Sequence, residues 1–132
     1  MRPIFHLSIP VSDLDRGIAF YVDALNGVLG RREQAWADVA VFGAQLTLQH
    51  QPQDVSNPMP RSRHFGATLE WSDWVELTDR LAAFVEAPRI SYPGTPREQA
   101  KAMICDPSGN FIEIKAYRDP VAVLGGLATG RE

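Results

Sequence analysis

The chain has 132 residues, of which 45% are hydrophobic and 22% are charged, and its formal net charge is −3. This length supports one domain with a real core, and the acidic balance excludes a broad basic surface for nucleic acid or an anionic membrane. No apolar run approaches the roughly 20 residues that cross a bilayer. Cys105 is the single cysteine, which excludes an internal disulfide and favours a reducing compartment, so we expect a cytoplasmic protein.

The first half of the chain predicts a strand, a helix and three strands. Residues 3–10 alternate as a strand, and Ser12 is a favourable N-cap for the helix that Asn26-Gly27 ends. The apolar residues of this helix recur at helical spacing and are Leu14, Ile18, Tyr21, Val22 and Leu25. The next predicted strands lie near 28–33, 36–42 and 44–50. Residues 51–63 hold three prolines without periodicity and predict a linker.

The second half repeats this order. Residues 64–71 predict a strand, Ser72-Asp73 predicts the start of a second helix, and Pro88 predicts its end. The apolar face of that helix comprises Trp74, Leu77, Leu81, Phe84 and Val85. Further strands are predicted near 89–92, 100–105 and 110–117, with a compact turn at "DPSG" (106–109). The polar, glycine-rich tail is expected to be partly loose.

The predicted fold is therefore α+β and contains two βαβββ modules in one domain. Module one covers about 3–50, the linker 51–63, module two about 64–118 and the tail 119–132. Such a repeat predicts two half-barrels related by an approximate two-fold axis. The linker allows the two modules to pair within one chain or to swap between two chains.

The repeat places particular polar residues at matching positions. His6 lies on the first strand of module one, and His64 lies on the first strand of module two. Thr47 and Glu113 each follow a strand-opening glycine, Gly43 or Gly109, by four residues. Because side chains alternate between the faces of a strand, all four fall on the face opposite the apolar residues.

Two imidazoles and a carboxylate on such faces favour a metal site. Either histidine alone is more often a satisfied or partly exposed residue than a ligand. It is the joint placement of His6, His64 and Glu113 that points to a cation. A 2-His-1-carboxylate set suits divalent Fe, Mn, Zn, Ni or Co and leaves positions open for substrate. Thr47 is a poor ligand and is expected to leave the metal exposed, and His50 receives no role.

Three stretches, "FHLSIPVSDLDRGIAFYVDALNG", "HFGATLEW" and "DPSGNFIEIKAY", together resemble the vicinal oxygen chelate superfamily, which contains glyoxalases, bleomycin-resistance proteins and dioxygenases. The resemblance covers about residues 3–118. It implies a cupped mixed β-sheet barrel around a central cavity, metal ligands on the first, fifth and eighth strands, and a homodimer. Those ligand positions correspond to His6, His64 and Glu113.

Many chemistries share this scaffold, so two functions remain open, and a retained but inactive scaffold is a third alternative. The first is a metal-dependent dioxygenase, lyase or transferase that acts on a small substrate chelated through oxygen atoms. In it Glu113, Glu70 and Lys115 are the candidate catalytic residues, and Thr47, Gln49 and Arg97 are the candidate substrate-binding residues. The alternative is a metal-free protein that binds a small molecule or antibiotic, as bleomycin-resistance proteins do. Thr47 stands where glyoxalase I has a fourth ligand, which argues against that particular enzyme.

Overall fold

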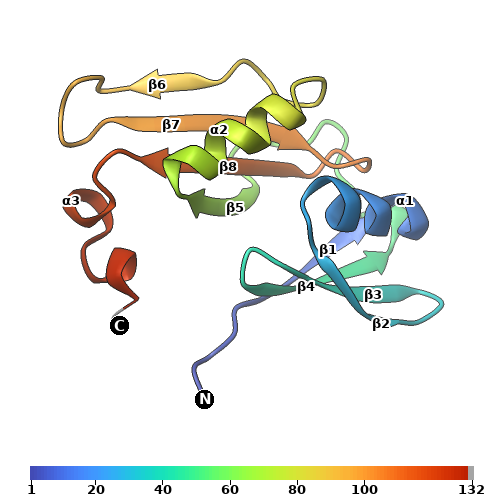
Figure 1. Ribbon diagram of the computed structural model, residues 1–132. Coiled ribbons are helices and arrows are strands. Elements are labelled where there is room, and N and C mark those ends of the chain that lie inside the picture. The colour runs from blue at the N-terminus through green and yellow to red at the C-terminus, as the bar shows by residue number, and fades with distance from the viewer. Residues whose placement is uncertain (131–132) are drawn as a thin grey trace. The chain divides into compact units, whose positions relative to one another are not determined.

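The computed structural model describes residues 1–130 and divides the chain into two compact units (Figure 1). Unit 1 comprises Met1–Arg63 together with Cys105–Phe111, and unit 2 comprises His64–Ile104 together with the chain from Ile112 onward. Each unit holds one four-stranded sheet and one main helix, in the chain order strand, helix and three strands. The predicted α+β fold of two βαβββ modules is confirmed.

The sheet of unit 1 is mixed and has the strand order β1-β4-β3-β2. β1 and β4 run parallel, whereas β4 with β3 and β3 with β2 run antiparallel. The strand predicted over 3–10 begins only at His6, and Phe5 just before it is 69% exposed. The strands are β1 (His6–Val11), β2 (Val28–Arg32), β3 (Trp36–Val41) and β4 (Ala44–His50).

The helix of unit 1 is α1 (Leu14–Ala19), which continues as a π-helical turn over Phe20–Ala24. The prediction that Ser12 caps it was wrong. Asp13 is the N-cap, and its carboxylate accepts a hydrogen bond from the Arg16 amide at 3.0 Å. Ser12 has another partner, because its amide donates to the Ser108 hydroxyl at 2.9 Å.

The predicted turn at 106–109 is confirmed, and its Asp106 is buried. Asp106 accepts hydrogen bonds from the amides of Ser108 and Asn110, from the Asn110 side chain and from the Tyr21 hydroxyl, all at 2.8–2.9 Å. Gly109 has φ +85°, a conformation that a glycine adopts without steric cost. These bonds tie the turn to the helical segment of unit 1.

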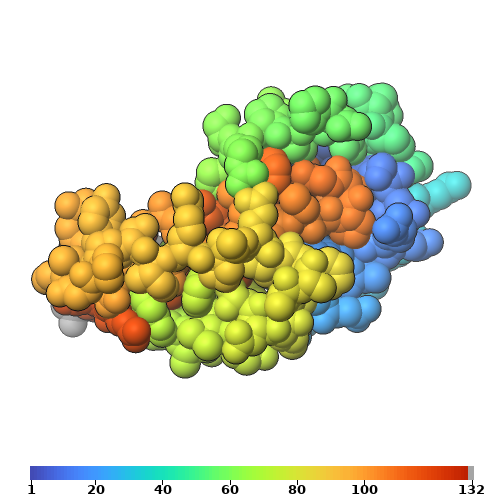
Figure 2. Space-filling view, turned by 90° about the horizontal axis from the view of Figure 1, so that it is seen from above, coloured from blue at the N-terminus to red at the C-terminus, as the bar shows by residue number. Residues whose placement is uncertain are grey.

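The sheet of unit 2 has the strand order β5-β8-β7-β6. Its main helix, α2 (Trp71–Arg80), presents the buried Trp74 and Leu77, and the Trp74 indole donates to the Ile114 carbonyl at 3.1 Å. Figure 2 shows α2 and the segment after it, in yellow-green and yellow, on the surface of this unit. The strands are β5 (His64–Leu69), β6 (Arg89–Ser91), β7 (Gln99–Cys105) and β8 (Phe111–Tyr117).

Both predicted limits of α2 were wrong. The helix starts at Trp71, before the predicted Ser72-Asp73 cap, and Glu70 at the N-cap position makes no side-chain capping bond. It ends at Arg80 rather than near Pro88, because the following backbone leaves the helix and the Glu86 amide donates to the Met103 carbonyl of β7. Phe84 is consequently 61% exposed and does not belong to a buried helical face.

The tail is more ordered than predicted. α3 (Pro120–Leu124) begins with a proline, and the Asp119 carboxylate caps it by accepting from the Ala122 amide at 3.1 Å. A 3-10 turn over Gly125–Thr129 follows, and residues 131–132 of the predicted tail lie outside the described residues. The predicted linker 51–63 is irregular apart from a short 3-10 helix at Pro52–Asp54. None of the helices within residues 1–130 is long and apolar enough to span a membrane.

Candidate functional site

Each unit has a cavity that is lined by residues of its sheet. The cavity of unit 1 has a volume of about 330 Å³, and that of unit 2 about 260 Å³. The first is lined by His6, Arg31, Trp36, Asp38, Gln45, Thr47 and Gln49. The second is lined by His64, Phe65, Gly66, Ala67, Thr68, Glu113 and Lys115. Six of the eight predicted site residues line these cavities, and Glu70 and Arg97 do not.

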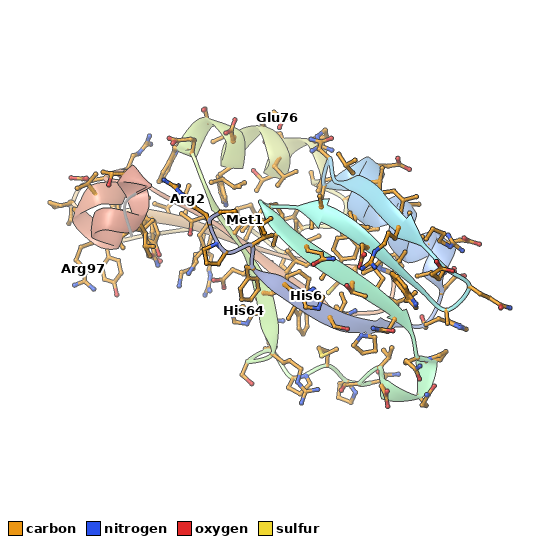
Figure 3. All side chains as sticks on the ribbon, turned by 90° about the horizontal axis from the view of Figure 1, so that it is seen from below. Met1, Arg2, His6, His64, Glu76 and Arg97 are labelled. Atoms are coloured by element: carbon orange, nitrogen blue, oxygen red, sulfur yellow. The ribbon has the colours of Figure 1, made fainter. Side chains whose placement is uncertain are left out.

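The cavity of unit 2 brings His64 of β5 and Glu113 of β8 together. The Nε2 atom of His64 lies 4.0 Å from Oε2 of Glu113, and the two side chains are 34% and 18% exposed, so both reach the cavity surface. Gly66 explains how the strands come so close, since an ideal Cβ on Gly66 would lie 1.7 Å from the Glu113 carbonyl oxygen. Figure 3 shows His64 on β5.

The Glu113 carboxylate retains unused acceptor capacity. Among residues 1–130 its polar side-chain neighbours are the His64 imidazole, with Nε2 at 4.0 Å, and the Lys115 ammonium, with Nζ at 3.7 Å. Both distances exceed the 2.7–3.2 Å of an N–H···O hydrogen bond. A carboxylate holds about four lone-pair sites, so Glu113 can ligate a cation without giving up a hydrogen bond.

In unit 1, His6 is oriented by the backbone of the neighbouring strand. Its Nδ1 atom lies 3.3 Å from the carbonyl oxygen of Gln45, the residue opposite it in the β1–β4 register (Figure 3). A carbonyl only accepts, so in the neutral imidazole this contact selects the tautomer that has its proton on Nδ1 and a lone pair on Nε2. Metal-binding histidines typically donate their second ring N–H in this way.

The carboxylate in the cavity of unit 1, Asp38, accepts a hydrogen bond on each of its two oxygens. It is buried on β3 directly opposite Thr47 of β4. The Thr47 hydroxyl donates to Oδ1 at 2.7 Å, and the Arg31 Nε donates to Oδ2 at 2.7 Å. The hydrogen bond from Thr47, and then the contacts with Arg31, outweigh the opposing effect of burial and hold the pKa of Asp38 below its ordinary value. Asp38 is therefore an ionised carboxylate at neutral pH.

The strand registers match the sequence-derived pairing of the modules. His6 opens β1 and His64 opens β5. Two residues further on, Ser8 lies opposite Thr47, and Gly66 lies against Glu113. Thr47 and Glu113 thus occupy equivalent places in the two sheets.

The remaining predicted residues lie outside this pattern. Gln49 lines the cavity of unit 1 and donates to the Ser8 hydroxyl at 3.3 Å. Glu70 is exposed just before α2 and does not line the cavity of unit 2. Arg97 is exposed in the loop after β6, with its guanidinium 4.8 Å from the Tyr92 ring centroid, and Figure 3 shows it at a distance from His64 of the same unit.

Sequence reasoning missed Asp38 and Arg31. The signal for Asp38 was present, because alternation along "WADVAV" places Trp36 and Asp38 opposite the apolar Ala37 and Val39. Arg31 carried no comparable signal, since every residue of β2 is exposed.

Neither unit, as described over residues 1–130, gathers three His, Cys, Asp or Glu side chains that hold a metal ion by themselves. Unit 2 supplies an imidazole and a carboxylate side by side, and unit 1 supplies an imidazole with an open nitrogen. In each unit the donor types suit a borderline divalent metal.

Comparisons with known proteins identify relatives over most of the chain. The sequence model of the Glyoxalase/Bleomycin resistance protein/Dioxygenase superfamily matches residues 4–114. The virulence protein STM3117 of Salmonella typhimurium strain LT2 is 32% identical over 122 residues, which cover 86% of this chain and 83% of that protein. A glyoxalase/bleomycin resistance protein/dioxygenase structure from Alicyclobacillus acidocaldarius has a TM-score of 0.80 at 28% identity and covers 92% of this chain and 96% of its own.

A more distant structure supports the fold alone. The fosfomycin resistance protein FosX from Listeria monocytogenes has a TM-score of 0.71 at 15% identity, covering 88% of this chain and 93% of that one. This similarity shows that the two chains share their architecture over nearly their whole lengths.

Proposed function

Because the chain belongs to the Glyoxalase/Bleomycin resistance protein/Dioxygenase superfamily, we propose that it is a divalent-metal-dependent enzyme acting on a small substrate bound through oxygen atoms. The proposed reaction is of the dioxygenase, lyase or transferase type, and the proposed ligands are His6, His64 and Glu113. The metal is Fe, Mn, Zn, Ni or Co. The same proposal includes a homodimer and a cytoplasmic location, which are both predictions made from the sequence.

The juxtaposition of His64 and Glu113 is the observation that carries this proposal. His64 Nε2 lies 4.0 Å from Glu113 Oε2 in one cavity. The Glu113 carboxylate accepts no hydrogen bond from the described residues. A glutamate that served only to stabilise the sheet would be expected to accept hydrogen bonds at normal distances, as Asp106 does.

His6 is the proposed third ligand for two reasons. It is the equivalent of His64 at the first position of β1, and the Gln45 carbonyl leaves its Nε2 lone pair open. Thr47, at the place equivalent to Glu113, has its hydroxyl proton committed to Asp38. Of these two residues, His6 is therefore the one that has a donor atom available for a metal.

The surrounding residues would hold and orient the substrate. A bound divalent ion supplies Lewis-acid chemistry to a substrate oxygen. The Lys115 ammonium, 3.7 Å from Glu113, is placed to hold negative charge that develops on the substrate. Gln49, whose amide donates to the Ser8 hydroxyl, and Thr47 line the cavity of unit 1. Proton transfer by Glu70 and closure by Arg97 remain predictions from the sequence.

Metal analysis of the protein purified without chelators tests the proposal. We expect a stoichiometric divalent metal in the parent, and a loss of metal affinity in His64→Ala and Glu113→Gln that exceeds the roughly 10- to 100-fold typical of residues behind the ligands. His6→Ala should behave in the same way. His50→Ala is the matched control, because His50 is an exposed histidine at the end of β4 and should leave binding unchanged.

The alternative function makes the opposite prediction. A metal-free binding protein would hold no metal at any stage, and the three ligand variants would bind added Zn²⁺ or Mn²⁺ as well as the parent does. Equal binding by the parent and His64→Ala would therefore remove the proposal.

A further inference from the structure

The cavity of unit 1 contains an arginine that is held in place from two sides. The Nε and Nη2 atoms of Arg31 both lie 2.7 Å from Oδ2 of Asp38. The guanidinium carbon also lies 4.9 Å from the centroid of the Trp36 ring, at cation–π distance. One edge and one face of the guanidinium are thereby fixed, and a side chain that is normally flexible is given one orientation.

The remaining edge of this guanidinium is available to a ligand. Asp38 and Trp36 are its only side-chain partners among residues 1–130. The Arg31 side chain is 70% exposed, and it lines the cavity. A guanidinium has five N–H donors in a rigid fork, so donors on Nη1 and Nη2 still point away from Asp38. This fork matches the two oxygens of a carboxylate or phosphonate.

A purely stabilising role explains Asp38 poorly. Burying the Asp38 carboxylate costs desolvation of its charge, so its pair with the 70% exposed Arg31 contributes little net stability. Asp38 is nonetheless buried, with its side chain 8% exposed, and Thr47 secures its other oxygen at 2.7 Å. The neighbouring Arg32, by contrast, pairs at 2.8 Å with Asp15, which is 83% exposed and lines neither cavity.

We propose that Arg31 binds an oxyanion of the substrate in the unit 1 cavity, with Trp36 contacting the apolar part of the ligand next to it. The inference deepens the proposed function, on which it rests for the identity of the ligand as the substrate, and it names the substrate class as a small organic acid with a carboxylate or phosphonate. Asp38 acts as a positioning residue. Because Asp38 also cancels the charge of Arg31, recognition depends on directed hydrogen bonds more than on net charge.

Calorimetric titration of the full-length, metal-stripped protein tests this subsite separately from the metal. The probes are benzoate, phenylphosphonate and the neutral benzamide. We expect at least one oxyanion to bind at least tenfold more tightly than benzamide, and Arg31→Gln to lose at least tenfold of that affinity. Arg31→Lys keeps the positive charge but not the forked donor geometry, and its affinity for the oxyanion should also fall several-fold. Arg32→Gln removes the same charge from the next residue and should change the affinity less than twofold.

Three outcomes would overturn the subsite: no oxyanion binding by the parent, equal binding of benzamide, or an Arg31→Lys variant with the parent's affinity. An equal loss in Arg32→Gln would also overturn it, because the effect would then be one of general charge. Should Arg31→Gln fail to fold, the benzamide comparison and Arg31→Lys still decide. Since no metal is present, these results are independent of whether His6, His64 and Glu113 bind an ion.

Discussion

Replacing Gly66 by alanine should damage both the fold of unit 2 and its half of the metal site. Gly66 lies between His64 and Thr68 on β5, where an added Cβ would sit 1.7 Å from the Glu113 carbonyl oxygen and 2.7 Å from its carbonyl carbon. Real Cβ atoms stay at least 3.0 Å from such atoms, so β5 and β8 would have to separate by about 1.3 Å at this point. The opposing atoms are backbone, which no change of rotamer can remove.

The expected cost follows from this geometry. Overpacking usually costs about 1–3 kcal/mol when side chains can adjust, and a backbone clash between paired strands should reach or exceed about 3 kcal/mol. For a chain of this size each kcal/mol lowers the Tm by roughly 3–5 °C, so Gly66→Ala should unfold roughly 10–15 °C below the parent. Displacement of Glu113 should also weaken metal binding at temperatures where the variant is folded.

Gly30→Ala is the matched control for this experiment. Gly30 also lies in a strand, β2, but an added Cβ would meet its nearest atom, the Asp38 carbonyl oxygen, at an ordinary 3.4 Å. Because alanine has less freedom than glycine in the unfolded chain, we expect a change within about 1 kcal/mol of the parent. Thermal unfolding by circular dichroism and metal titration provide the measurements. Equal stability of the two variants would refute the close approach of β5 and β8.

The other predictions concern buried hydrogen bonds and the metal. Tyr21→Phe removes the donor to Asp106 and should cost about 1.5–3 kcal/mol near neutral pH. Burial, and then Asp106, raise the pKa of Tyr21, so the parent loses about 1.4 kcal/mol per pH unit above about pH 10, where only the unfolded state releases this proton. In denaturant unfolding, the difference in unfolding free energy between the parent and Tyr21→Phe should therefore shrink as the pH rises above about 10. Parallel plots of unfolding free energy against pH for the two proteins would contradict this. The lowered pKa of Asp38 contributes stability that is present above about pH 4 and is lost as the pH falls through its folded-state pKa. In urea unfolding between pH 2 and 6, the Asp38→Asn variant should lack this part of the acid dependence. Metal at about 100 times its Kd should raise the unfolding free energy of the parent by about 2.7 kcal/mol, and a chelator should abolish this increase. An equal increase in His64→Ala would argue against the site.

The duplicated fold could be predicted because its signals are local. Alternation along each strand identifies the buried face without knowledge of the strand's partner. The glycines before Thr47 and Glu113 then fixed the register between the modules, and the pairing of Ser8 with Thr47 agrees with it. The close contact of Gly66 with Glu113 is the corresponding feature of unit 2.

What the sequence did not reveal depends on distant partners. Ser12 has the chemistry of an N-cap, yet its partner is Ser108, 96 residues away. α2 stops early because Glu86 finds a backbone acceptor on β7. The alternation pattern placed Asp38 on the polar face. Its hydrogen bond with Thr47, however, follows from the strand register that sets the two residues opposite each other. Such pairings are decided by tertiary structure and carry no local pattern.

The two acidic residues of the cavities indicate how the repeated units diverged. Asp38 accepts hydrogen bonds from a hydroxyl and a guanidinium and has little capacity left for a cation. The polar side chains nearest the Glu113 carboxylate among residues 1–130 lie beyond hydrogen-bond distance. A cation should therefore select unit 2, and the arginine that Asp38 orients makes unit 1 suited to an anion. A small acid with a carboxylate or phosphonate would match the donors of the Arg31 fork in unit 1. A neutral substrate would leave the Arg31 fork without a partner, and this difference is what the comparison of benzoate with benzamide measures.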